Sequence, residues 1–142
     1  MGGFEGRRQE SMVIDSHALM WWLEGSEELS EIARDILDEA EERAERHRVC
    51  AVTFWEMRWK EVRGQLQPKL GVRFWPALLA DLAWLEIEET SVSIWLSTAE
   101  LEWDHRDPAD RIIAATALKY SEPVLTRDAR FHEPDSPVKA VW

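Results

Sequence analysis

Apolar and polar residues follow two different periodicities along this chain, and each change of period marks a predicted element. Short runs of strand character occupy residues 12–15, 48–52, 85–88, 124–127 and 138–142. Helical spacing occupies residues 18–23, 30–46, 53–63, 74–85, 91–102 and 108–118. Strands that alternate with helices are typical of a three-layer α/β/α sandwich with a mostly parallel five-stranded sheet.

The clearest helix runs from Ser30 to about residue 46. It places apolar residues on one face and charged residues on the other, and Ser30 is a suitable N-cap. The run 18–23 is apolar nearly all round and ends near Gly25, so it needs cover on more than one side. In the helix after residue 107, Pro108 stands in the first turn, where its missing N–H costs little.

Four acidic residues stand where a predicted strand ends or a predicted helix begins. Asp15 closes the first strand, Glu56 follows the second by a few residues, and Asp128 follows the strand at 124–127. Asp110 begins the alanine-rich helix. Ligands of open α/β sheets bind outside the carboxyl ends of the strands, so we expect these four carboxylates to meet there and bind a divalent metal ion.

The composition fits one domain. A chain of 142 residues with 45% hydrophobic content can build one core and is too short for two. The only cysteine, Cys50, lies in a predicted strand and is expected to be a buried free thiol, which suits a cytoplasmic protein. Neither a membrane span nor a signal peptide is recognisable. We expect a flexible tail over residues 1–10 and a single domain over residues 11–142.

The net charge of −11 is unevenly distributed. Residues 31–46 contribute −4 and residues 86–104 contribute −6, which leaves −1 for the rest of the chain. That remainder holds most of the basic residues, several of them close in sequence to the four acids: Arg48, Arg58, Lys60, Arg63, Arg106, Arg111, Arg127 and Arg130. A basic rim around an acidic pocket is therefore compatible with the composition, and the negative charge does not exclude a nucleic-acid substrate.

Several short motifs surround the acids. Residues 13–23 begin Val-Ile-Asp-Ser-His, residues 53–60 begin Thr-Phe-Trp-Glu, residues 105–111 read His-Arg-Asp-Pro-Ala-Asp-Arg, and residues 125–128 read Leu-Thr-Arg-Asp. In this order they resemble the PIN-domain ribonucleases, and within them the VapC-type toxins of toxin–antitoxin pairs. The likeness spans residues 12–142.

The resemblance implies a magnesium- or manganese-dependent endoribonuclease that is usually a homodimer and is held inactive by a cognate antitoxin. It carries the family's acids onto Asp15, Glu56, Asp110 and Asp128, with Asp107 as a rival for the third. Thr126 matches a position where the family often has a hydroxyl near the metal, and Trp55 and Trp59 look like variants of apolar positions around the second acid. Supporting roles around the metal are assigned to Asp107, Thr126 and Ser16, and RNA contacts to Arg106, Arg111 and Arg127.

Magnesium needs only one or two direct carboxylates because it keeps several waters. We therefore assign Asp15 and Asp110 as the principal ligands. Glu56 and Asp128 would orient waters, complete a second metal site or help to deprotonate the nucleophile. In-line attack by water would leave products with a 5′-phosphate and a 3′-hydroxyl.

Each of these residues also has a purely structural interpretation. Thr53 and Glu56 have the spacing of a capping box, and Glu56 with Lys60 has that of a surface ion pair. Asp110 suits a helix N-terminus and Asp128 could cap a turn. His17 and His105 are expected at the surface or as supporting residues, and the pair Trp21 and Trp22 belongs either to the core or to a partner surface.

Two other functions compete with the nuclease. An aspartyl-phosphate receiver or phosphatase also places aspartates at strand ends, but Asp15-Ser16-His17 lacks the Asp-x-Asp of a phosphatase loop, and no lysine is clearly placed for a receiver. A catalytically inactive PIN module that binds RNA or protein would keep the fold without turnover. The presence of all four acids argues against it.

Overall fold

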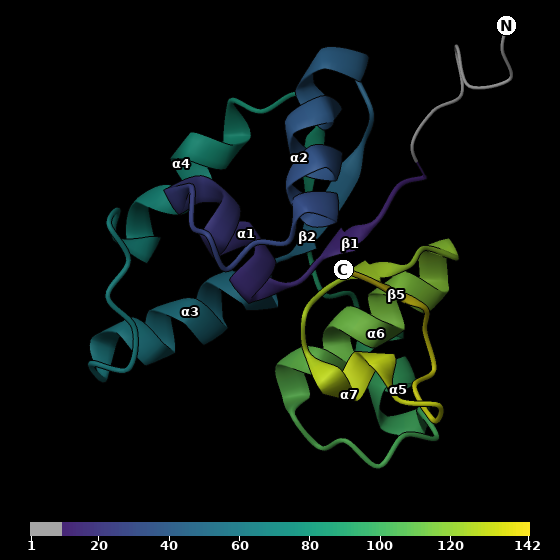
Figure 1. The fold of residues 1–142 in the computed structure, drawn as a ribbon. Helices are drawn as coiled ribbons and strands as arrows, with labels where there is room; N and C mark the ends of the chain where they lie inside the picture. Colours follow the sequence, from purple (N-terminus) through teal and green to yellow (C-terminus); the bar gives the residue numbers. More distant parts are fainter. Residues whose placement is uncertain (1–9) are drawn as a thin grey trace, which may run out of the picture.

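Five strands form one sheet in the order β3-β2-β1-β4-β5 (Figure 1). The computed structural model describes residues 10–142, so the tail expected over residues 1–10 lies, except for Glu10, outside the described residues. Every strand pair is parallel, and the predicted α/β class is confirmed. The strands are β1 (Val13–Ile14), β2 (His47–Cys50), β3 (Leu85–Glu88), β4 (Val124–Leu125) and β5 (Ala140–Val141).

Helices cover both faces of the sheet. They are α1 (Ser16–Glu24), α2 (Glu31–Arg43), α3 (Val52–Val62), the 3-10 helix η1 (Val72–Phe74), α4 (Trp75–Ala80), α5 (Val92–Glu100), α6 (Pro108–Tyr120) and α7 (Ala129–His132). Helices α1, α2 and α4 lie on one side, and α5, α6 and α7 on the other (Figure 1). None of the helices within residues 10–142 is both long and apolar enough to cross a membrane.

The two-residue period of the strands explains these layers. Ile14 and Leu125 point into the core shared with α1, α2 and α4, whereas Val13 and Val124 point into the core shared with α6 and α7. All four side chains have no exposed surface. Cys50, the buried free thiol that the sequence predicts, lies in the second of these cores, and burial raises its pKa to about 11.

Side-chain caps set several helix ends. Ser30 accepts a hydrogen bond from the N–H of Ala33 at 3.0 Å, as predicted. Helix α2 ends earlier than expected, because Ala44 adopts a left-handed conformation. Helix α1 starts at Ser16, two residues before the prediction, and ends at Gly25, where φ is +63°. Glycine adopts this conformation without steric cost.

The predicted helix over residues 74–85 is wrong in its second half. Helix α4 ends at Ala80, and turn-type bonds join Leu82 N to Leu79 O and Leu85 N to Leu82 O. The chain leaves the helix because Leu85 must pair with His47 in β2, and the N–H of His47 donates to Trp84 O at 2.9 Å. Helix α7 is an element that the sequence prediction lacks.

Candidate metal centre

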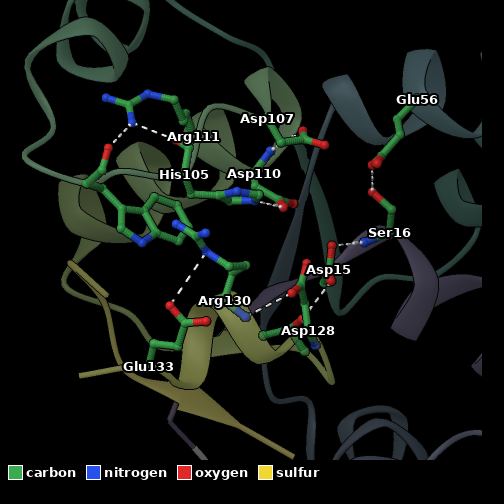
Figure 2. A network of polar contacts seen from close by, with 12 residues as sticks. Asp15, Ser16, Glu56, His105, Asp107, Asp110, Arg111, Asp128, Arg130 and Glu133 are labelled. Carbon is green, nitrogen blue, oxygen red and sulfur yellow. Dashed lines mark hydrogen bonds and ion pairs between the residues drawn. The ribbon is translucent and has the colours of Figure 1, made fainter. Parts of the chain in front are cut away.

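The four acids meet in one pocket beyond the carboxyl ends of β1 and β4. Strands β1 and β4 are neighbours, with Ile14 beside Leu125, so Asp15 and Asp128 emerge from the same edge of the sheet. Helix α3 brings Glu56, and the first turn of α6 brings Asp110 (Figure 2). The pocket is lined by Asp15, His17, Trp21, Glu56, Lys60, Asp107, Asp110, Arg127 and Asp128.

Asp15 is buried and held by two hydrogen bonds. One carboxylate oxygen, Oδ1, accepts from the N–H of Ser16 at 2.7 Å, and the other, Oδ2, accepts from Thr126 Oγ1 at 2.6 Å. Burial raises the pKa of Asp15 to about 6 although the Thr126 hydrogen bond favours the ionised form, and the charge of Glu56 raises it further. Thr126 therefore touches the proposed ligand, as expected of a supporting hydroxyl.

Asp110 has a histidine as its closest polar neighbour. Its Oδ2 lies 2.6 Å from Nε2 of His105, and both side chains are largely buried (Figure 2). Burial raises the pKa of Asp110 to about 9, and the charge of Asp15 is the next largest cause. Asp107 stands one turn earlier as the N-cap of α6, where its Oδ1 accepts from the N–H of Asp110 at 3.1 Å. Asp107 thus lines the pocket and also caps the helix that carries Asp110.

Glu56 is oriented by Ser16, which follows Asp15 in the chain. Ser16 Oγ donates to Glu56 Oε1 at 2.8 Å and lies 2.9 Å from Thr53 Oγ1. The alternative interpretation of Thr53 and Glu56 as a capping box is wrong. The N-cap of α3 is Ala51 rather than Thr53, and no side chain caps this helix. The pair with Lys60 does form, at 3.4 Å between Nζ and Oε2. The second acid is therefore tied to the first through one serine.

Asp128 combines the two roles considered for it. Its Oδ1 accepts from the N–H of Arg130 at 2.9 Å and caps α7, while its own N–H donates to Thr126 Oγ1 at 3.0 Å. It also lines the pocket, and potential ligand atoms of His105, Asp110 and Asp128 all lie within 4.8 Å of one another. Capping does not take this carboxylate out of the site.

These residues fit a hard divalent cation. The donor set is dominated by carboxylate oxygens, which Mg²⁺ and Mn²⁺ prefer, and one histidine is within reach. The raised pKa values of Asp15 and Asp110 show that the metal-free pocket disfavours their ionised forms. A bound cation reverses that preference because it stabilises the charged carboxylates.

The basic residues around the pocket differ in what they can contact. Arg111 was expected to contact RNA, but its guanidinium donates five hydrogen bonds, at 2.7 to 3.0 Å, to the carbonyl oxygens of Thr98, Leu101, Trp103 and His105. No donor of Arg111 remains for a phosphate, so this expectation is corrected. Arg111 instead fixes the loop that carries His105 and Asp107. Arg106 is exposed on that same loop.

Arg127 stands at the pocket with its guanidinium 4.3 Å from the centre of the Trp21 ring. It also pairs with Glu28. Trp21 is thus a pocket residue, whereas its neighbour Trp22 packs edge-to-face on Trp84 in the core, with ring centres 5.3 Å apart. Both tryptophans are half-buried and pack against the core, as one interpretation predicts, and Trp21 also lines the pocket.

The sequence analysis gave too little weight to two residues that line the pocket and to one residue that contacts Asp110. Lys60 was considered as a partner of Glu56 and as one of several rim residues, and it lines the pocket itself. His17, expected at the surface or in a supporting role, lines it too, and burial and then the charge of Lys60 lower its pKa. His105 directly contacts Asp110. The sequence signal for His105 was its place in the motif His-Arg-Asp-Pro-Ala-Asp, which begins with His105 and ends with Asp110.

Comparison with known proteins identifies the class of this fold. The family model of the PIN domain matches residues 12–136, so the chain belongs to the PIN domain family. Ribonuclease VapC22 of Mycobacterium tuberculosis (strain ATCC 25618 / H37Rv) is 29% identical over 137 residues, which cover 93% of this chain and 98% of that protein. The resemblance predicted from the sequence is confirmed.

Solved structures share the fold at low sequence identity. A DNA-bound VapBC from Salmonella typhimurium superposes with a TM-score of 0.63 and 14% identity, covering 94% of this chain and 98% of that one. FitAB bound to an IR36 DNA fragment gives 0.62 and 23%, covering 92% and 93%. A toxin–antitoxin complex from Klebsiella pneumoniae gives 0.59 and 21%, covering 91% and 99%.

Proposed function

We propose that this protein is a divalent-metal-dependent endoribonuclease that acts as the toxin of a toxin–antitoxin pair. The observation that carries the proposal is the convergence of Asp15, Glu56, Asp110 and Asp128, from four separate segments, in one pocket. The sequence similarity to a ribonuclease extends over nearly the whole chain, and it supports RNA as the substrate. The structural likeness to toxin–antitoxin complexes supports an antitoxin as the partner.

Asp15 and Asp110 would hold the metal ion, Mg²⁺ or Mn²⁺, with Asp128 and Glu56 completing its surroundings. When bound, such an ion supplies Lewis acidity toward a phosphodiester and activates water as a nucleophile. The hydroxyls of Ser16 and Thr126 fix the carboxylates of Glu56 and Asp15. Fixed ligands keep their geometry without reorganisation, and loss of such supporting contacts typically weakens metal binding.

His105 keeps Asp110 in place in both of its protonation states. A neutral Asp110 donates its proton to Nε2, and an ionised Asp110 accepts from Nε2 when that nitrogen carries the hydrogen. Asp107 contributes by capping the helix from which Asp110 projects. Arg111 anchors the loop that carries His105 through two of its bonds, to Trp103 O and His105 O.

The pocket also carries positive charge and an aromatic ring. Lys60 and Arg127 line the pocket together with Trp21 and His17. We assign Lys60 and Arg127 to the phosphates that flank the cleaved bond, because ammonium and guanidinium groups bind phosphate oxygens. Arg106, exposed on the loop before α6, would contact the same strand farther along. Single-stranded or loop RNA is the proposed target, since sequence-specific RNA recognition mostly uses unpaired regions.

An amphipathic helix of the antitoxin would find apolar surface on this chain. Leu70, Phe74 and Leu78 are 43% to 62% exposed on and beside η1 and α4. Exposed apolar groups of this size in neighbouring positions suit a partner helix. A homodimer and a cytoplasmic location complete the proposal, the latter in keeping with the buried free thiol of Cys50.

The test is cleavage of a mixed RNA pool by antitoxin-free protein in Mg²⁺, Mn²⁺ or EDTA. Asp15→Asn and Asp110→Asn remove the proposed ligands, and Asp135→Asn is the matched control because Asp135 is exposed and outside the pocket. We expect metal-dependent products with 5′-phosphate and 3′-hydroxyl ends, lost in the first two variants only. Folded protein that cuts nothing with either metal would contradict the nuclease and favour the inactive binding module.

A further inference from the structure

Helix α3 presents two adjacent rows of side chains near the metal pocket. Residues four apart share a helix face, so Glu56 and Lys60 form one row and Trp55 and Trp59 form the next. Glu56 and Lys60 line the pocket. Trp55 is 55% exposed and Trp59 46%, and their ring centres are 5.4 Å apart at an angle of 42°. An aromatic strip therefore runs along the rim of the pocket.

The aromatic strip forms one wall of a second hollow. This hollow is lined by Trp55, Glu56, Trp59, Lys60, Asp107, Pro108 and Ala109, so it lies between α3 and the first turn of α6. Glu56, Lys60 and Asp107 also line the metal pocket. The two hollows thus share a border, and a chain held in one can pass directly into the other.

Positive charge accompanies the aromatic rings. The guanidinium carbon of Arg63 lies 3.3 Å from the centre of the Trp59 ring, and Lys60 stands at the border between the two hollows. Arg63 covers one face of Trp59, so Trp55 offers the more open ring. Proteins bind single-stranded nucleic acids with aromatic rings beside cationic side chains, because every base can stack on a ring and every linkage carries a phosphate.

We propose that Trp55, extended by Trp59, stacks an unpaired base of the RNA next to the cleaved phosphodiester, with Lys60 on the phosphate between them. The proposal rests on the proposed ribonuclease function and adds a nucleotide subsite to it. An RNA strand with one phosphate at the acids places its neighbouring nucleotides at the rim of the pocket. The aromatic strip lies beside the part of this rim that the two hollows share. The shared border and the adjacent cations favour RNA over a protein partner on this surface.

The experiment uses a short single-stranded RNA that wild-type protein cleaves at one site. Each nucleotide near the cut is replaced in turn by an abasic one, and kcat/KM is measured for wild type, Trp55→Ala, Trp55→Phe and Trp59→Ala. Trp95→Ala is the matched control, because Trp95 is 54% exposed on α5 and lines neither hollow. Urea unfolding confirms that each variant folds, and sedimentation records its oligomeric state.

We expect Trp55→Ala to lower kcat/KM about tenfold on intact RNA, with partial recovery in Trp55→Phe and no change in Trp95→Ala. One abasic position should cause a similar loss in wild type and little further loss in Trp55→Ala, because both remove the same stacking contact. Equal losses at every abasic position in both proteins would overturn the subsite. So would a Trp55→Ala variant that cleaves normally but no longer self-associates, which would assign the strip to a protein contact.

Failure of the two proposals is distinguishable. If wild-type protein cleaves no RNA, the proposed function fails and the subsite with it. If wild type cleaves and Trp55→Ala cleaves equally well, only the subsite fails.

Discussion

The protonation state of Asp110 controls the stability of the metal-free protein between neutral and alkaline pH. The pKa of Asp110 is about 9 in the folded protein and 3.8 without the fold. Between these values Asp110 holds a proton in the folded chain but not in the unfolded chain. The stability that this group contributes is therefore fully present below pH 3.8. It is lost as pH rises from 3.8 to about 9, at about 1.4 kcal/mol per pH unit.

The window from pH 6.5 to 8.5 isolates this group among the described residues. Asp15, with a pKa of about 6, has already ionised below the window. Burial lowers the pKa of His47 to about 4 and also lowers the pKa of His17, so these two groups have the opposite effect, a loss of stability as pH falls through 6.5, at the lower edge of the window. The pKa of Cys50 rises from 9.0 to about 11, which acts above the window. Over these two pH units Asp110 should cost about 2 to 3 kcal/mol.

Urea unfolding in EDTA at pH 6.5, 7.5 and 8.5, followed by tryptophan fluorescence, measures this loss. Asp110→Asn keeps the shape but cannot ionise, so its stability should stay nearly level and exceed that of wild type at pH 8.5. Asp135→Asn makes the same substitution at an exposed position and should keep the wild-type slope. An equal slope in wild type and Asp110→Asn would contradict the raised pKa of Asp110, because the group would then be ionised throughout.

Substitutions at three further residues test the side chains that support the ligands. Ser16→Ala removes the hydroxyl that joins Glu56 to the site, and we expect about tenfold weaker Mn²⁺ activation of RNA cleavage, measured by metal titration. His105→Ala should weaken that activation by about 10- to 100-fold, with His105→Gln closer to wild type if an N–H donor suffices. Arg111→Lys keeps the charge but leaves several carbonyl oxygens without a partner, which should lower the unfolding free energy by about 2 kcal/mol or more in urea titrations. Unchanged titrations in Ser16→Ala and His105→Ala would count against these supporting roles, as would unaltered stability in Arg111→Lys.

The sequence allows the sheet and the convergence of the acids to be predicted because both follow from local patterns. Strands such as Val13–Ile14 are short apolar runs buried on both sides, and the residue after such a strand emerges at the edge of the sheet. Asp15 follows that rule directly, whereas Asp128 stands three residues beyond the end of β4, and the family resemblance supported both assignments. The position of Ser30 as a cap was equally local, since a serine before an amphipathic run satisfies free N–H groups.

What the sequence could not predict depends on packing between distant segments. Helix α4 ends early because Leu85 pairs with β2, which no local pattern around residue 80 reveals. Arginine is a common phosphate ligand, but the guanidinium of Arg111 is occupied by carbonyl oxygens of the loop before α6. His105 reaches Asp110 only once that loop has closed. Each of these outcomes required the tertiary structure.

The proposed function requires that this pocket cleaves RNA through a metal ion held by Asp15 and Asp110. The most direct measurement is a Mn²⁺ titration in which bound metal, by electron paramagnetic resonance, and cleavage of one defined RNA are recorded in the same samples. We expect cleavage to rise in step with the bound metal, and both to be lost in Asp15→Asn and Asp110→Asn. Cleavage that persists in EDTA, or at the wild-type rate in either variant, would contradict the claim.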